Sequence, residues 1–205
     1  MRLIWALIGL CCLIEFTLLL ADWGLVATVR LRALAYDYGG FWPGLLRDWQ
    51  PNFALQPVVM FVSYGFLHAG LIHLGVNMMT LWSLSRGVYD RAGARGFAAI
   101  YGLSILGGAV GYALLASNLA PMVGASGGLF GLAGALLGFS YAERRSQNVG
   151  LWPIGRAVIL LTLLNLVLWW AMRGQLAWQT HLGGFVAGWV VALLQHRATP
   201  LELDG

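Results

Sequence analysis

The sequence contains no lysine and few charged residues of any kind. Charged side chains make up 10% of the 205 residues, hydrophobic residues make up 60%, and the mean hydropathy is +0.76. A water-soluble domain of this size carries more charge, so most of the chain is expected to face lipid. The twelve basic residues are all arginines, scattered singly or in pairs between apolar runs. This pattern indicates membrane-topology signals and excludes a nucleic-acid interface.

Cysteine and clustered acidic residues are also scarce. The cysteines, Cys11 and Cys12, are adjacent within an apolar run, and we expect them to be packing residues. The chain has no HExxH spacing and no acidic residue between Glu143 and Glu202, which disfavours a zinc site. We therefore predict neither a metal nor another cofactor.

Long apolar runs make up most of what remains. A transmembrane helix needs about 20 such residues, and we predict helices over 3–21, 69–86, 97–116, 124–142, 154–172 and 179–195. The expected fold is an all-α membrane protein, a six-transmembrane-helix bundle in which residues 1–205 form a single domain. Residues 22–68 are predicted to be a loop at the membrane interface. A seventh span near 53–67 is the less favoured alternative, because Pro57, Gly65 and the adjoining His68 make it a poor one.

The arginines predict the orientation of such a bundle. With six spans, one side receives Arg2, Arg86, Arg91, Arg95, Arg144, Arg145, Arg156 and Arg197, and the other receives Arg30, Arg32, Arg47 and Arg173. This excess favours cytoplasmic termini, and the absence of a lengthy targeting segment favours a bacterial cytoplasmic membrane. Glu15 lies inside the first span and is expected to face other helices or water, although the sequence identifies no partner for it.

Polar residues lie near the starts of the second, fourth and sixth predicted helices, which would all enter from the outer face. His73 and Asn77 belong to the second helix, Ser126 to the fourth and His181 to the sixth. A serine and a histidine in contact would supply a nucleophile and a general base. His73, Asn77 and the Ser126 amide would then be donors to an oxyanion. Each residue also has a structural alternative, and for Asn77 an interhelical hydrogen bond weighs about equally.

Glycines surround the candidate serine and histidine. Gly124 and Gly127 flank Ser126, while Gly184 and Gly188 form a GxxxG-type strip beyond His181, so we expect the two helices to approach closely. Phe130 lies one turn after Ser126 and could stack on the histidine ring, although core packing explains it nearly as well.

A third member for a triad could come only from three outer carboxylates, which makes a Ser126/His181 dyad the simpler hypothesis. These carboxylates are Asp22, Asp37 and Asp48.

Three motifs in this order resemble the rhomboid intramembrane serine proteases: HAGLIHLGVN at 68–77, GASG at 124–127 followed by Phe130, and THLGGFVAG at 180–188. The resemblance implies that Ser126 is the nucleophile and His181 the base and acid. It implies an oxyanion hole of His73, Asn77 and the Ser126 amide, with His68 supporting the preceding loop. The glycines at 184 and 188 resemble the close-packing glycines of that family.

The resemblance also implies a water-filled cavity open to the outer face and transmembrane protein substrates that enter sideways, between the second and fifth helices, from the lipid bilayer. One departure is that Val59-Met60 replaces a Trp-Arg pair found in many members. Two other function classes stay open: a rhomboid-like pseudoenzyme that binds helices without cleaving them, and a small transporter or channel. The oligomeric state and the cleavage-site preference cannot be inferred from the sequence.

Overall fold

The structure, a computed structural model, describes residues 1–26 and 30–198, and its regular elements are helices. Its elements are α1 (Arg2–Asp22), α2 (Leu31–Gly39), the 3₁₀ helix η1 (Pro43–Leu46), α3 (Gln56–Ser63), the 3₁₀ helix η2 (Tyr64–Phe66), α4 (Leu71–Leu115), α5 (Ser126–Ser146), α6 (Trp152–Ala171) and α7 (Trp178–Ala198). Within the described ranges the chain forms no β-strand beyond one isolated bridge between Phe41 and Met122. The all-α prediction is therefore confirmed.

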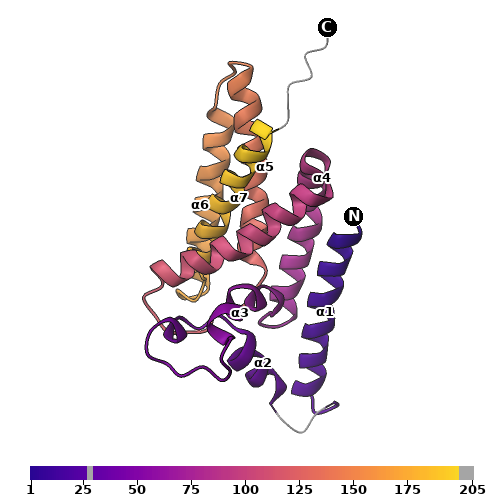
Figure 1. The fold of residues 1–205 in the computed structure, drawn as a ribbon, viewed down its shortest axis with the longest axis vertical. Helices are drawn as coiled ribbons and strands as arrows, with labels where there is room; N and C mark the ends of the chain where they lie inside the picture. The colour runs from indigo at the N-terminus through magenta and orange to yellow at the C-terminus, as the bar shows by residue number, and fades with distance from the viewer. Residues whose placement is uncertain (27–29, 199–205) are drawn as a thin grey trace.

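Helix α4 corresponds to two of the predicted helices. It is continuous over 45 residues except at Gly93, whose φ of 65° and ψ of −174° are not helical. Figure 1 shows two arms that meet at this kink and run in different directions. The expected ten-residue connection is thus wrong, because residues 87–96 continue the helix on both sides of one left-handed glycine, a conformation that glycine adopts without steric cost.

Three helices in the described part of the chain are long and apolar enough to cross a membrane by length and composition: α1, α4 and α6. Helices α5 and α7 each have 21 residues, as α1 does, but they contain more glycine and polar side chains. The apolar helices make this chain an integral membrane protein. The criterion finds three candidate spans in the described part of the chain, so it does not confirm the predicted count of six.

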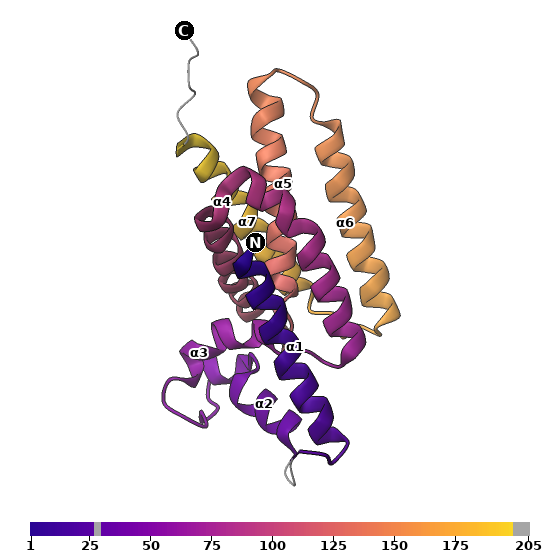
Figure 2. The ribbon, with the colours of Figure 1, turned by 90° about the vertical axis from the view of Figure 1, so that its right-hand side faces the viewer.

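The described residues of the predicted loop 22–68 include short helices. These are α2, η1, α3 and η2, which lie beside the C-terminal half of α1 and below the ends of α5, α6 and α7 in Figures 1 and 2. The alternative of a seventh span near 53–67 is wrong, because α3 has eight residues and rises only about 12 Å, far less than the hydrocarbon thickness. Within α3, Met60 is fully buried whereas Val59 is exposed.

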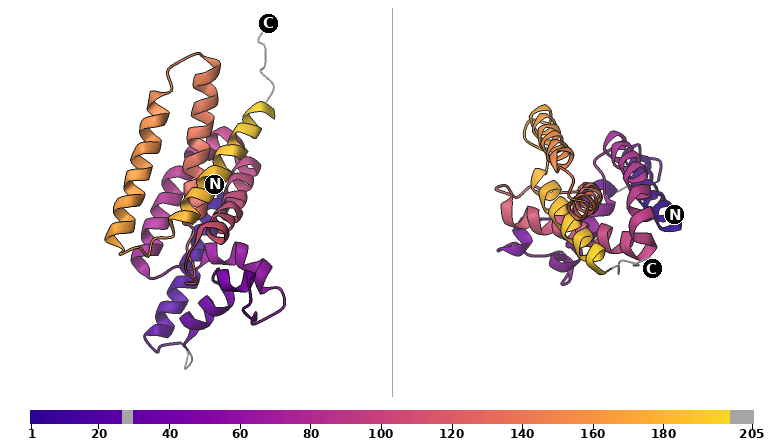
Figure 3. Two further views of the ribbon diagram at one scale, coloured as in Figure 1. Left: turned by 90° about the vertical axis from the view of Figure 1, so that its left-hand side faces the viewer. Right: turned by 90° about the horizontal axis from the view of Figure 1, so that it is seen from above.

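The starts of α4, α5 and α7 all lie at the end of the bundle next to α2 and α3 (Figure 1). The sequence predicted that these three helices start at the same face of the membrane, and their starts do lie at one end of the bundle. Helices α5 and α7 pack most extensively against each other, and the second arm of α4 packs against both. In contrast, α6 lies on the outside of the molecule in each of the views in Figures 2 and 3.

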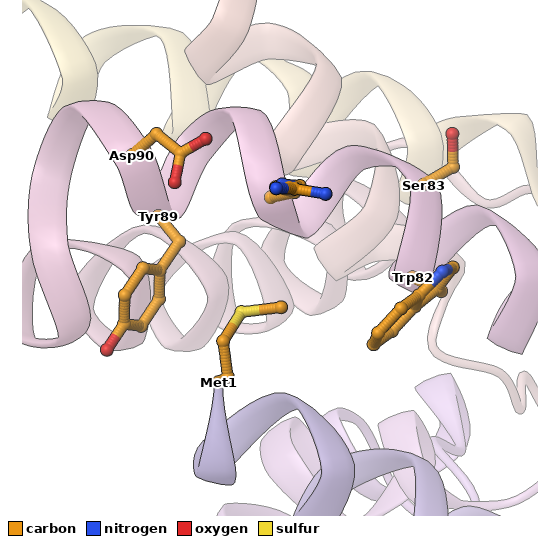
Figure 4. Close-up of a pocket in the computed structure, with 6 residues that line it drawn as sticks. Met1, Trp82, Ser83, Tyr89 and Asp90 are labelled. Atoms are coloured by element: carbon orange, nitrogen blue, oxygen red, sulfur yellow. The ribbon is translucent and has the colours of Figure 1, made fainter.

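A pocket lies at the other end of the first arm of α4, near the start of α1. The residues that line it are Met1, Trp82, Ser83, Arg86, Tyr89 and Asp90 (Figure 4). Because Asp90 is 17 residues beyond His73 in the same helix arm, the two are separated by about 25 Å along the axis. The pocket is therefore distinct from the place where the candidate catalytic residues lie.

Candidate active site

Glycines bring the backbones of α5 and α7 into direct contact. A Cβ atom placed on Gly184 would collide with the carbonyl oxygen of Gly127, and one placed on Gly188 would collide with that of Gly131. Only glycine permits this approach, since any side chain would push the helices apart. The predicted close-packing strip is thus present, and it fixes the start of α5 beside the start of α7.

His181 lies against this junction. It is 6% exposed, and its ring stacks on Phe130 of α5 with a centroid distance of 4.1 Å and an interplanar angle of 7°. Ser126 is the first residue of α5, one turn before Phe130 and on the same helix face. The same face of α5 therefore presents the hydroxyl and holds the imidazole. The Ser126 hydroxyl donates no hydrogen bond to any described residue. Catalytic hydrogen bonds are often long in the absence of substrate and shorten only when substrate binds.

An amide that the sequence analysis missed contacts the other nitrogen of His181. The Oδ1 atom of Asn165 in α6 lies 2.6 Å from His181 Nδ1, and Asn165 Nδ2 donates a hydrogen bond of 2.9 Å to the carbonyl of Leu161. The sequence offered only carboxylates as a third member of a catalytic triad, and one of these, Asp22, pairs with Arg32 instead. The available signal was a polar amide within an apolar helix, which is costly in lipid unless it has a partner.

His73 and Asn77 meet at Gly124, two residues before Ser126. A Cβ on Gly124 would lie 2.9 Å from His73 Nε2 and 3.8 Å from Asn77 Nδ2, and the φ of Gly124 is +131°, a value that favours glycine. The backbone N–H of Ala69 donates to His73 Nδ1 at 3.2 Å, which leaves the proton on Nε2. Both nitrogens facing Gly124 are therefore hydrogen-bond donors.

Asn77 carries a donor without a partner. Its side chain is 4% exposed, and Nδ2 has no hydrogen-bond acceptor among the described residues. A buried amide donor left unpaired costs about 1–3 kcal/mol, so Nδ2 calls for an acceptor that the described residues do not supply. An interhelical hydrogen bond through Nδ2, the structural alternative for Asn77, is absent here.

A charged network supports the turn that leads into His73. Glu15 is fully buried in α1 and forms an ion pair of 2.9 Å with Arg32 of α2. Arg32 Nη1 donates to the carbonyl of His68 at 3.2 Å, and Tyr36 OH donates to the same oxygen at 2.8 Å. The partner that the sequence did not identify for Glu15 is thus Arg32. Together they hold the turn whose next residue, Ala69, binds His73.

His68 itself is fully buried, and its ring lies 5.3 Å from that of His73 in an edge-on arrangement. Burial, followed by the charge of His73, lowers the pKa of His68 to about 4. A neutral, enclosed imidazole is a packing element of the turn. The supporting role expected of His68 stays a prediction, and the structure places its ring inside the turn, against His73.

The segment before Ser126 is anchored to the N-terminal half of the chain. Phe41 and Met122 exchange two backbone hydrogen bonds of 3.0 Å, and the N–H of Gly124 donates to the carbonyl of Tyr64 at 2.9 Å. In residues 1–26 and 30–198, no three His, Cys, Asp or Glu side chains are grouped to hold a metal. What the geometry assembles is a hydroxyl at a helix start, a buried imidazole and two aimed donors.

A serine, a histidine and hydrogen-bond donors placed together among apolar helices are the features of a candidate serine-hydrolase site in a membrane protein. The comparison with known families identifies which family of membrane proteins this is. The family model of the Rhomboid domain matches residues 56–198, which is more than half of the chain. The chain therefore belongs to the rhomboid family, which agrees with the resemblance of its three motifs.

Several individual proteins that the chain resembles also carry rhomboid names. The chain is 32% identical over 126 residues to the "Rhomboid protease GluP" of Bacillus subtilis (strain 168), covering 62% of this chain and 24% of that protein. It is 32% identical over 141 residues to "RHOMBOID-like protein 5" of Arabidopsis thaliana, covering 65% and 42%. It is 29% identical over 144 residues to "Rhomboid protein 1, mitochondrial" of Saccharomyces cerevisiae (strain ATCC 204508 / S288c), covering 63% and 40%. The chain thus spans less than half the length of these relatives.

Proposed function

We propose that this chain is an intramembrane serine endopeptidase that hydrolyses peptide bonds in or near the transmembrane segments of single-span membrane proteins. Ser126 is the nucleophile, and His181 is the general base and then the general acid. The proposal is supported by membership of the rhomboid family and by the relative from Bacillus subtilis that is named a protease. It requires no cofactor.

The reaction follows from the positions of these groups. Ser126 Oγ attacks the scissile carbonyl carbon while its proton passes to His181 Nε2, which gives a tetrahedral intermediate with a negative oxygen. His181 then returns that proton to the leaving amine as the peptide bond breaks. Water, activated by the same nitrogen, hydrolyses the acyl-enzyme and restores the hydroxyl.

Three donors are available for the negative oxygen. They are His73 Nε2, Asn77 Nδ2 and the N–H of Ser126, which as the first helical residue of α5 has no intrahelical acceptor. The single observation that carries the proposal is the unpaired, buried Asn77 donor beside Gly124. An oxyanion is the missing partner that this donor fits, and losing one such donor typically lowers the rate by about 10²–10³.

The membrane arrangement belongs to the same proposal. Residues 1–205 act as one domain that crosses the bilayer six times, with α4 crossing once in each arm, and with residues 22–68 at the interface. The arginine distribution supports cytoplasmic termini and an active site that opens outward in a bacterial cytoplasmic membrane. The loose packing of α6 supports sideways entry of a substrate helix beside it.

The rival function is a rhomboid-like pseudoenzyme, and labelling by a fluorophosphonate probe in detergent separates the two. The wild type should be labelled, whereas Ser126→Ala should not be and His181→Ala should lose nearly all labelling. Persistent labelling of Ser126→Ala would show that another residue reacts. An unlabelled, folded wild type that still binds a transmembrane helix would establish the pseudoenzyme, and a loss of activity with chelator would indicate a metal.

A further inference from the structure

One polar contact joins the outer helix α6 to the candidate base. Asn165 is half-buried on a helix whose only buried residue is Ile154, and its Oδ1 atom lies 2.6 Å from His181 Nδ1. The contact bridges two helices that otherwise pack little against each other. It therefore brings a residue of α6 into direct contact with the group that must accept the serine proton.

The second hydrogen bond of Asn165 fixes which way its amide points. Asn165 Nδ2 donates to the carbonyl of Leu161, one turn earlier in α6, so Oδ1 is the atom presented to the imidazole. An amide oxygen accepts hydrogen bonds and cannot donate them. The proton of neutral His181 must then lie on Nδ1, which leaves the lone pair on Nε2 as the proton acceptor.

We propose that Asn165 is a positioning residue that holds His181 in the tautomer required for catalysis, which completes a Ser126, His181 and Asn165 arrangement across α5, α7 and α6. This inference rests on the proposed protease function. Phe130 fixes the plane of the ring through stacking, and Asn165 fixes its rotation and its proton. The imidazolium formed during the reaction keeps the same acceptor at Nδ1, so no rearrangement accompanies proton transfer.

The location of this residue makes the base depend on the position of α6. A displacement of α6 that separates Asn165 from His181 frees the ring to adopt the other tautomer, which has its proton on Nε2 and cannot accept one from serine. The geometry therefore links the seating of α6 to the competence of the dyad. A substrate helix that contacts α6 would act on catalysis through this hydrogen bond.

The test compares Asn165→Leu, which has a similar size and no acceptor, with Asn165→Asp and with Thr162→Val. Thr162 is a suitable control because its hydroxyl bonds only to Val158 of its own helix and is exposed. We expect Asn165→Leu to lower kcat roughly 10–100-fold with KM changed less than about twofold, since the loss is in the transition state. Thr162→Val should match the wild type.

The conservative variant gives a readout that packing alone would not move. Asn165→Asp returns an acceptor to the same position, and its carboxylate stabilises the imidazolium, so kcat should recover at high pH while the acidic limb of the pH profile moves upward. The other titratable group that acts on His181 is His73 of α4, and it is present in every variant. Equal kcat values for Asn165→Leu and the wild type would overturn the proposal, as would equal losses in the Leu and Asp variants.

Nitrogen-15 NMR of labelled histidine separates failure of this inference from failure of the proposed function. The signals of His181 in folded wild type should show the proton on Nδ1, whether or not the protein cleaves anything. In Asn165→Leu they should shift toward a mixture of tautomers, with the four histidines assigned by single substitutions. A wild-type ring protonated on Nε2 would overturn the inference, while an active-site serine that never reacts would overturn only the protease function.

Discussion

Helices α6 and α7 are neighbours in the chain and similar in length, but they are held very differently. Within 178–196, the part of α7 whose burial is described, five residues are buried: Thr180, His181, Gly184, Gly188 and Ala192. Two of its glycines touch the backbone of α5. In α6 only Ile154 is buried, and large apolar side chains cover its sides. The difference is one between a helix fixed by backbone contact and a helix that few side chains of the protein hold in place.

This contrast assigns different tasks to the two helices. Under the proposed function, proton transfer requires the serine and histidine to be positioned with a precision of a fraction of an ångström, which suits the pair of helices in backbone contact. The same proposal has a substrate helix arriving from lipid, which suits a neighbouring helix that moves at low cost. The contrast would fail if the contact between α5 and α7 tolerated substitutions, or if α6 proved sensitive to them.

The largest effect should come from placing a side chain in the α5 and α7 contact. Gly184→Val forces a β-branched group into the backbone of Gly127, and we expect it to lower the free energy of unfolding in detergent by about 4–5 kcal/mol or to prevent folding. Gly155→Ala in α6 is the control, because the nearest atom to the new Cβ would lie 4.0 Å away. That change should stabilise by about 0.5–1 kcal/mol. Similar melting curves for both variants would remove the proposed contrast.

The next effect concerns the support beneath His73. Arg32→Ala leaves Glu15 buried without its ion pair, so we expect a loss of about 3–4 kcal/mol in unfolding free energy. The exposed pair of Arg91 and Glu143, with side chains 40% and 45% accessible, provides the control. Arg91→Ala should cost less than about 1 kcal/mol. If chemical denaturation gave equal losses, Glu15 would not depend on Arg32 for its burial.

A matched pair of leucines tests the same contrast with a single type of substitution. Leu132 of α5 is fully buried and Leu163 of α6 is 51% exposed. Leu132→Ala should cost about 3 kcal/mol through the cavity that it leaves, whereas Leu163→Ala should cost less than about 0.5 kcal/mol. Thermal unfolding in one detergent measures both. A large loss for Leu163→Ala would mean that α6 packs against protein more tightly than its exposure indicates.

Much of the contact between α5 and α7 could be predicted from the sequence, because it depends on the spacing of residues within each helix. The glycine spacing after His181 and the four-residue step from Ser126 to Phe130 specify one helix face, whatever the rest of the fold does. The same holds for the boundaries of α5, α6 and α7, which differ from the predicted ranges by no more than four residues. The family model matches residues 56–198, a range that includes these motifs.

What the sequence could not provide depends on contacts between distant segments. Arg32 and Glu15 pair because α2 lies against α1, and nothing in the spacing of these two residues indicates that contact. Asn165 meets His181 because the turn after α6 sets the rotation of both helices, a register that hydropathy does not encode. The apolar run at 53–67 was ambiguous for a similar reason, since a short buried helix and an interrupted span share the same composition.

The smallest expected effect is a pH dependence of stability that comes from His68, in the turn before α4. Burial, and then the charge of His73, lowers the pKa of His68 to about 4 from about 6.5, so the folded state favours the neutral ring more than the unfolded state does. Stability from this residue is complete above the ordinary pKa and falls as the pH drops from about 6.5 toward 4, which amounts to about 2 kcal/mol by pH 5.

His68→Leu should remove that part of the acid sensitivity, as measured by the difference between its unfolding curves and those of the wild type at pH 7.5 and about pH 5. Helix α6 has no ionisable side chain beyond Arg156, so amide exchange within residues 160–171 should respond to acid equally in both proteins. The turn before α4 should become more exchangeable in the wild type alone. If acid increased amide exchange in α6 of the wild type but not of His68→Leu, then α6 and the turn before α4 would be coupled more directly than their packing indicates.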